Sequence, residues 1–131
     1  MPRATVEVRR SYAAEEEVAI LDAVHAALVA AFRIPEQDKH LRLVVHEPHR
    51  FAVPPTLDQP DRATLVTIDC FAGRSLGAKR ALYSEIVTRL DALGIPPGCV
   101  SILLRESPLE DWGISGGQAA CDVELGFEVR V

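Results

Sequence analysis

The sequence lacks the signatures of several broad protein classes. No apolar run approaches the ~18 residues of a membrane-spanning helix, and charges within the first ten positions argue against a signal peptide. The 131 residues carry a formal net charge of -5 without a basic stripe, which argues against nucleic acid or an anionic membrane as a partner. These absences predict a cytoplasmic protein.

Cysteine and metal-binding patterns are also sparse. The three cysteines, Cys70, Cys99 and Cys121, are widely spaced without a CxxC pair, which predicts free thiols in a reducing compartment. His46 and His49 lie close together but lack a carboxylate-rich surrounding, so a solvated loop is favoured there over a zinc site. No metal or other cofactor is expected.

What remains is an ordinary globular composition, with 48% hydrophobic and 25% charged residues. A chain of this length can bury a sizeable core, and we expect a single domain over residues 1–131. Alternating apolar residues predict a strand over 4–9, and helical spacing predicts a helix capped by Ser11 that ends near Phe32. A second strand is expected over 41–46, and its run of Leu43, Val44 and Val45 suggests burial on both faces.

A proline-rich link over 47–62 separates this pattern from a second one. A strand is expected over 64–71, followed by a helix capped by Ser75. Its expected apolar stripe consists of Leu82, Ile86, Leu90 and Leu93. A fourth strand over 100–105, a glycine-rich loop over 107–119 and a short strand over 123–131 complete the expected elements.

The two patterns look like copies of one β-α-β unit, over about 1–47 and 63–106. Ala4-Thr5-Val6 matches Ala63-Thr64-Leu65, and Ile34-Pro35 matches Ile95-Pro96, although chance similarity between two common units is the alternative. Paired units predict an α/β (α+β) fold, a four-stranded sheet with two helices on one face. We expect the other face to be apolar and to be covered by oligomerisation.

The second residue of the chain is Pro2, directly after Met1. If Met1 is removed, Pro2 has a secondary amine, and α-amino groups titrate near ~7.7–8.0, closer to neutrality than lysine. Such an amine can act as base, acid or nucleophile. If Met1 is retained, the nitrogen is an unreactive tertiary amide, so the hypothesis depends on processing.

Two charged residues stand where the expected elements begin. Asp38 precedes the second strand, and Arg74 precedes the helix that Ser75 caps. An arginine beside a helix N-terminus can grip a carboxylate with two parallel hydrogen bonds. The alternatives are that Arg74 is a solvated turn residue and that Asp38 is an ordinary loop carboxylate beside His40.

The order of these features resembles the tautomerase superfamily, with malonate semialdehyde decarboxylases as the closest likeness. The likeness rests on Met1-Pro2 opening a strand, the doubled β-α-β unit, Asp38, Arg74-Ser75, and Asp111-Trp112-Gly113 before Gly116-Gly117. It covers nearly the whole chain and implies a homotrimer that uses an N-terminal proline.

The resemblance also implies residue roles. Pro2 would be the catalytic amine, Asp38 the acidic residue that orients water or substrate, and Arg74 the second of two carboxylate-binding arginines. Trp112 would help to wall the pocket. Ala72 stands where the first arginine is expected, and this departs from the decarboxylase pattern.

Together these features predict a cofactor-free enzyme acting on a small oxo acid, by malonate semialdehyde decarboxylation or keto–enol tautomerisation. The protonation state of Pro2 would decide between them, and Trp112, Ile114 and Phe127 are candidates for the walls that set it. Alternatives are a non-catalytic trimeric binding or scaffold protein, favoured by a retained Met1, and a ferredoxin-like small-molecule binding domain.

Overall fold

The computed structural model describes residues 2–131, so Met1, on which the Pro2 hypothesis depends, lies outside the described residues. The main elements are β1 (Arg3–Val8), α1 (Ala14–Phe32), β2 (Leu41–Val45), β3 (Thr64–Phe71), α2 (Leu76–Asp91) and β4 (Val100–Ser107). Two short strands, β5 (Gly113–Ile114) and β6 (Gln118–Ala119), form a hairpin after β4. Single 3-10 turns lie at Pro48–Arg50, Pro60–Arg62, Pro97–Cys99, Leu109–Asp111 and Ala120–Asp122.

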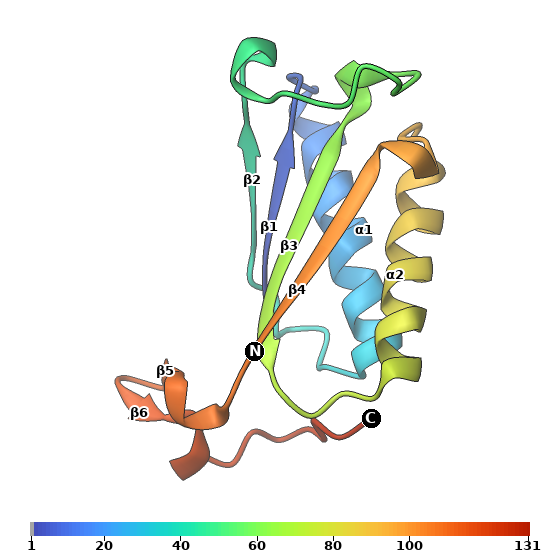
Figure 1. Cartoon of the computed structure of the whole chain (residues 1–131). Helices are drawn as coiled ribbons and strands as arrows, with labels where there is room; N and C mark the ends of the chain where they lie inside the picture. Colours follow the sequence, from blue (N-terminus) through green and yellow to red (C-terminus); the bar gives the residue numbers. More distant parts are fainter. Residues whose placement is uncertain (1) are drawn as a thin grey trace.

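The predicted fold class is confirmed. The four-stranded sheet has the order β2-β1-β3-β4, and both helices cover the same face (Figure 1). Each β-α-β unit has parallel strands, β1 with β2 and β3 with β4, whereas β1 and β3 run antiparallel at the centre of the sheet. No helix among residues 2–131 has both the length and the apolar character needed to cross a membrane.

The core lies between the helices and the inner face of the sheet. Alternate residues of the two central strands point inward because side chains of a strand alternate between its faces. These inward residues are Ala4, Val6 and Val8 from β1, and Val66, Ile68 and Cys70 from β3, all 1% exposed or less. The helices meet them with Ile20, Val24, Leu28 and Phe32 from α1, and Leu82, Ile86 and Leu90 from α2.

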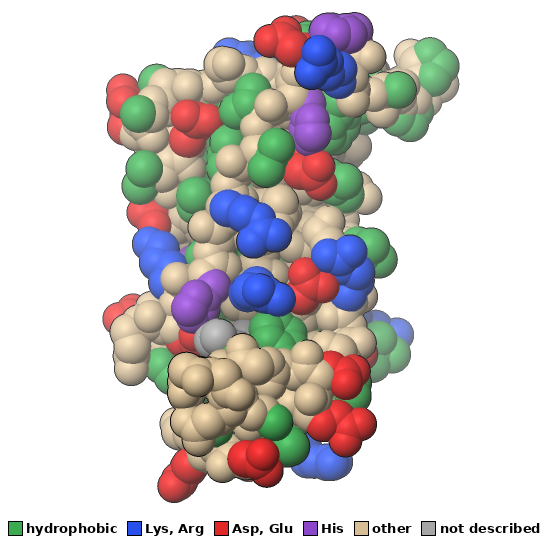
Figure 2. Space-filling model, turned by 90° about the vertical axis from the view of Figure 1, so that its left-hand side faces the viewer, with side chains coloured by type: hydrophobic (Ala, Val, Ile, Leu, Met, Phe, Trp, Pro, Cys, Tyr) green, Lys and Arg blue, Asp and Glu red, His purple; other side chains and the backbone are tan. Residues whose placement is uncertain are grey.

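The expectation of an apolar outer face is wrong. The same alternation that buries the core residues turns Glu7 of β1, Arg42 of β2 and Asp69 of β3 outward. Arg105 of β4 donates to both carboxylate oxygens of Asp69, at 2.8 and 3.0 Å. Figure 2 shows basic and acidic side chains interspersed on the side of the molecule where β2 lies. Leu65 of β3 and Leu103 of β4, the latter 53% exposed, are apolar residues of this otherwise mostly polar face.

The prediction that β2 is buried on both faces is also wrong. Val44 and Val45 are 37% and 42% exposed. Their strand lies at an edge of the sheet, so one of its sides has no neighbouring strand in this chain. A run of apolar residues therefore marks an exposed edge here rather than a central strand.

The two predicted helix caps had different outcomes. Ser75 caps α2 as expected, and its Oγ accepts the Ala78 N–H at 3.1 Å. Ser11 does not cap α1, which begins at Ala14, and the N–H of the N-cap residue Ala13 instead donates to Glu16 Oε1 at 3.3 Å. A carboxylate three residues into the helix thus satisfies this N–H group, as in half of a capping box.

Three further boundaries differ from the prediction. Helix α2 ends at Asp91, and Leu93 lies beyond it and is 41% exposed, so it is not part of the buried stripe. Strand β4 continues to Ser107. The expected strand over 123–131 is not formed, and this tail runs as irregular chain past the start of α2, where Ser75 Oγ donates to the Val131 carbonyl at 2.8 Å.

Candidate active site

The candidate site residues converge at one end of the sheet. Because β1 and β3 are antiparallel, the start of β1 lies beside the end of β3, with Arg3 paired to Asp69. Pro2 directly precedes Arg3 and is buried. Figure 1 shows the N-terminus, the β5–β6 hairpin and the C-terminal tail at this end of the molecule.

Arg74 is a buried cation with unsatisfied hydrogen-bonding groups. Its side chain is 5% exposed, and Nη1 donates to the Phe71 carbonyl at 3.3 Å. Nε and Nη2 are buried and form no hydrogen bond with the described residues. The guanidinium lies 4.7 Å from the centre of the Phe32 ring and 6.0 Å from that of Phe127. This arrangement stabilises a positive charge by cation–π contact and leaves N–H donors for an anion.

Burial lowers the pKa of the Arg74 guanidinium, and electrostatic interactions with Cys70, Glu106 and Asp38 oppose this effect. An arginine nevertheless stays protonated in proteins. Burying this cation therefore lowers the stability of the folded protein. Such a cost is expected where a charged group binds a ligand rather than stabilises the fold.

Asp38 lies in the loop between α1 and β2. Its side chain is 14% exposed, and Oδ1 lies 3.0 Å from His40 Nε2. The loop is fastened to α1 because His25 Nε2 donates to the Glu36 carbonyl at 2.7 Å. Since the charge of Asp38 affects the pKa of Arg74, the two side chains lie within electrostatic range of one another.

Trp112 and Ile114 lie in the segment that follows β4. Trp112 is 7% exposed, its Nε1 donates to Ser107 Oγ at 2.8 Å, and its ring packs edge-on against Phe71 at 4.9 Å. The guanidinium of Arg3 lies 5.1 Å from the centre of the Trp112 ring on the opposite side of the strand from the core. Ile114 belongs to β5 and packs against the same aromatic cluster.

Two cavities adjoin these residues and share Ile114 as a wall. One, of about 350 Å³, is lined by Asp38, His40 and Phe127 among others. The second, of about 250 Å³, is lined by Arg3 and Trp112 among others. Phe127 contacts both the first cavity and the Arg74 guanidinium, so this ring lies between the cation and the cavity.

The structure adds residues that the sequence analysis did not select. Phe32 and Arg3 contact Arg74 and Trp112 respectively, and Ser107 anchors the indole. Phe32 ends the apolar stripe of α1, which at the sequence level indicates only a core position. The outward turn of Arg3 follows from strand alternation, but its contact with Trp112 joins residues over a hundred positions apart.

Cys70 is buried among the core residues. Within residues 2–131 no group of three His, Cys, Asp or Glu side chains could hold a metal ion. Burial raises the pKa of the Cys70 thiol to about 11, although the charge of Arg74 opposes this rise. A thiol with such a pKa is protonated at neutral pH and is a poor nucleophile.

Cysteine alkylation tests the placement of Cys70. With iodoacetamide at pH 8, we expect exposed Cys121 to react at least ~100-fold faster than Cys70 in the native protein, because Cys70 is buried and burial raises the pKa of its thiol. Peptide mass spectrometry at timed intervals measures the two rates, and unfolding in urea should make them similar. Equal rates in the native protein would mean that Cys70 is accessible and would make its thiol a candidate catalytic group.

Known structures share this architecture. A malonate semialdehyde decarboxylase is 24% identical with a TM-score of 0.81, over 93% of this chain and 99% of that chain. The FG41 malonate semialdehyde decarboxylase inhibited by 3-bromopropiolate is 28% identical with a TM-score of 0.75, over 89% and 92%. A wild-type fused 4-OT, described as a symmetric trimer, is 24% identical with a TM-score of 0.79, over 90% and 95%.

The family comparison goes beyond the fold. Residues 38–115 match the family described as tautomerase enzyme, a range that includes Asp38, Arg74, Trp112 and Ile114 and begins after Pro2. This match covers more than half of the 131 residues and confirms the resemblance seen in the sequence. The chain therefore belongs to the tautomerase family of enzymes.

Proposed function

We propose that this protein is a cofactor-free enzyme that acts on a small oxo acid with the amine of Pro2, after removal of Met1. Arg74 binds the substrate carboxylate, Asp38 orients water or the carbonyl end of the substrate, and Trp112 and Ile114 form the walls. The observation that carries the proposal is the buried Arg74 guanidinium, whose Nε and Nη2 groups have no partner among the described residues.

The position of Arg74 supports a carboxylate substrate. The guanidinium lies within cation–π distance of two aromatic rings, and its contact with the Phe71 carbonyl uses Nη1 alone. The free Nε and Nη2 edge has the geometry for a bidentate bond to a carboxylate. Ala72 supplies no second cation two residues earlier, so the carboxylate depends on Arg74 to a greater degree than in a two-arginine site.

The protonation state of Pro2 selects the reaction. A neutral amine removes a proton from the carbon beside the carbonyl and returns it to the oxygen or carbon of the enolate, which gives tautomerisation. A protonated amine polarises the carbonyl of a 3-oxo acid and stabilises the enolate formed as carbon dioxide leaves. Burial of Pro2 disfavours the cation and so favours the neutral amine.

We further propose that the active form is a homotrimer. The fused 4-OT with this fold is described as a symmetric trimer. In the present chain the exposed apolar residues of the sheet lie on its two edge strands, Val44 and Val45 on β2 and Leu103 on β4. Association through these edges would bury them and would pair strand edges that are open in the single chain.

The amine chemistry is tested by intact mass before and after treatment with glyoxylate and borohydride. We expect loss of Met1 and a single reduced adduct that maps to Pro2, because glyoxylate combines an aldehyde with the carboxylate that Arg74 recognises. Acetaldehyde, which lacks the carboxylate, is the matched reagent and should label more slowly. Native mass spectrometry of the same sample reports whether three chains associate.

Two outcomes have separate meanings for the proposal. A retained Met1 without an adduct would contradict the proposed chemistry and would favour the non-catalytic binding protein. Loss of Met1 without an adduct would exclude an imine route, and the enol–keto conversion of phenylpyruvate, followed in the ultraviolet, then tests acid–base tautomerisation directly. Absence of both activities, with Met1 removed, would contradict the proposal.

A further inference from the structure

A third cavity, larger than the two described above, lies at the opposite end of the sheet from Pro2. Its volume is about 550 Å³, within the ~300–1,000 Å³ range of small-molecule sites. Part of its wall is a row of outward residues on three adjacent strands, Glu7, Leu65 and Ser101, which are register partners. The proline-rich link between β2 and β3 supplies Phe51 and Val53 to the same wall.

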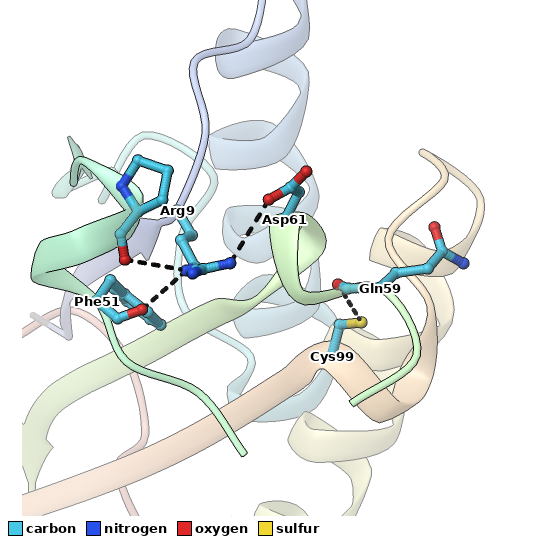
Figure 3. A network of polar contacts seen from close by, with 6 residues as sticks. Arg9, Phe51, Gln59, Asp61 and Cys99 are labelled. Carbon is cyan, nitrogen blue, oxygen red and sulfur yellow. Dashed lines mark hydrogen bonds and ion pairs between the residues drawn. The ribbon is translucent and has the colours of Figure 1, made fainter. Parts of the chain in front are cut away.

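The link is held in place by contacts near both of its ends. Arg9 Nε donates to the Phe51 carbonyl at 2.9 Å, and Arg9 Nη1 pairs with Asp61 at 3.5 Å (Figure 3). At the other side of the link, Cys99 Sγ donates to the Gln59 carbonyl at 3.4 Å. These contacts fasten both ends of the link to the strands, so the cavity is formed before any ligand enters.

The chemistry of this cavity is apolar with a few polar groups. His46 Nε2 lies 2.9 Å from Glu7 Oε1, and its ring lies against Phe51 with centroids 5.5 Å apart. Exposed Arg50 also lines the cavity, and no carboxylate of residues 2–131 pairs with it. An apolar wall beside one unpaired guanidinium fits a ligand that has an apolar body and a carboxylate.

The location of the cavity follows from the arrangement of the two β-α-β units. Because β1 and β3 are antiparallel, they begin at opposite ends of the sheet. The start of β3 is therefore the counterpart, at the far end, of the start of β1. Each end is covered by the segment that follows an edge strand, the proline-rich link after β2 and the β5–β6 hairpin after β4. At the far end, however, the chain continues through Ala63, so no terminal amine exists there.

We propose that this cavity is a second binding site, for small carboxylic acids with an aromatic or branched aliphatic body. Arg50 binds the carboxylate, and the apolar body lies against Phe51, Val53 and Leu65. The His46–Glu7 pair forms the polar side of the site. Without an amine nucleophile the ligand is bound and is not converted through the chemistry proposed for Pro2.

The test uses phenylacetate as the probe and its neutral counterpart phenylacetamide, added to the assembled, isotope-labelled protein. By amide NMR, we expect saturable shifts of residues 50–57 and 98–101, with phenylacetate at least ~10-fold tighter than the amide. Shifts near Arg74 report the Pro2 end separately. An Arg74→Met variant should remove those shifts and leave the shifts of the second site, so the two sites are distinguished.

Matched variants make the site assignment specific. Ala52 is exposed and lines the cavity, so Ala52→Trp should fill the cavity and weaken phenylacetate binding more than ~10-fold. Ala92 is exposed at the end of α2, away from the cavity, and Ala92→Trp should leave phenylacetate binding unchanged. Arg50→Gln should abolish the preference for the acid over the amide, and Arg80→Gln should preserve it. The proposal is overturned by shifts confined to the Pro2 end, by no saturable shift at about 10 mM probe, or by wild-type affinity in Ala52→Trp.

Discussion

Replacing Arg74 with methionine is expected to lower kcat/KM for an oxo-acid substrate about 100- to 1,000-fold without lowering stability. The substrate carboxylate would be buried without a partner, and a 100- to 1,000-fold loss corresponds to about 3–4 kcal/mol, within the range expected for removing one partner of a buried charge pair. The folded protein, by contrast, loses a desolvated guanidinium that has unsatisfied Nε and Nη2 groups. Methionine keeps an apolar chain between Phe32 and Phe127, so we expect an equal or higher Tm.

Steady-state kinetics and thermal unfolding of the same preparations measure the two effects. Arg80→Met, on the exposed face of α2, is the matched control and should change neither. A variant at Arg74 that is strongly destabilised but normally active would show that the guanidinium has a structural role. A lower activity together with a higher stability is expected only if Arg74 serves function and destabilises the folded protein.

Truncation of Phe32 to alanine is expected to reduce the free energy of unfolding by about 3–5 kcal/mol. Its side chain is fully buried, with 0% exposure, and the cavity left by a missing ring adds to the lost burial. Because single domains are stable by only ~5–15 kcal/mol, this is a large part of the total. Urea unfolding of the wild type and the variant measures the difference.

A second substitution separates the two roles of this ring. Phe32→Leu should cost no more than about 1.5 kcal/mol, since volume is largely kept, but it removes the aromatic face 4.7 Å from the Arg74 guanidinium. We therefore expect a folded variant in which kcat/KM falls about 10-fold. Val18→Ala, at a 57% exposed position of the same helix, is the control. A fully active Phe32→Leu would limit Phe32 to core packing.

The elements with a strong local pattern were predicted closely. Strand β3 has the predicted bounds, and Ser75 caps α2 because a hydroxyl at that position can accept an N–H of the first turn. The prediction failed at the start of α1, where two different side chains could cap the helix. Ser11 had the residue type of a cap, but the Glu16 carboxylate satisfied the N–H of Ala13, and α1 began three residues later.

Other failures concern the neighbours of a segment rather than the segment itself. Leu43, Val44 and Val45 look the same in sequence whether their strand is central or at an edge, and the strand order left β2 at an edge. The tail over 123–131 has apolar residues but no neighbouring strand to pair with. It lies instead beside the start of α2, where Phe127 reaches Arg74.

The sequence by itself determined the doubled β-α-β pattern, the family resemblance and the candidate residues Pro2, Asp38, Arg74 and Trp112. Periodicity, caps and residue order are local properties, and they survive in any environment that lets the elements form. Tertiary structure alone decided that Arg74 is desolvated between Phe32 and Phe127, that the outer face of the sheet is charged, and that a cavity beside Arg50 lies opposite the Pro2 end. These properties depend on antiparallel pairing of β1 with β3, which joins residues about sixty positions apart and leaves no local signal.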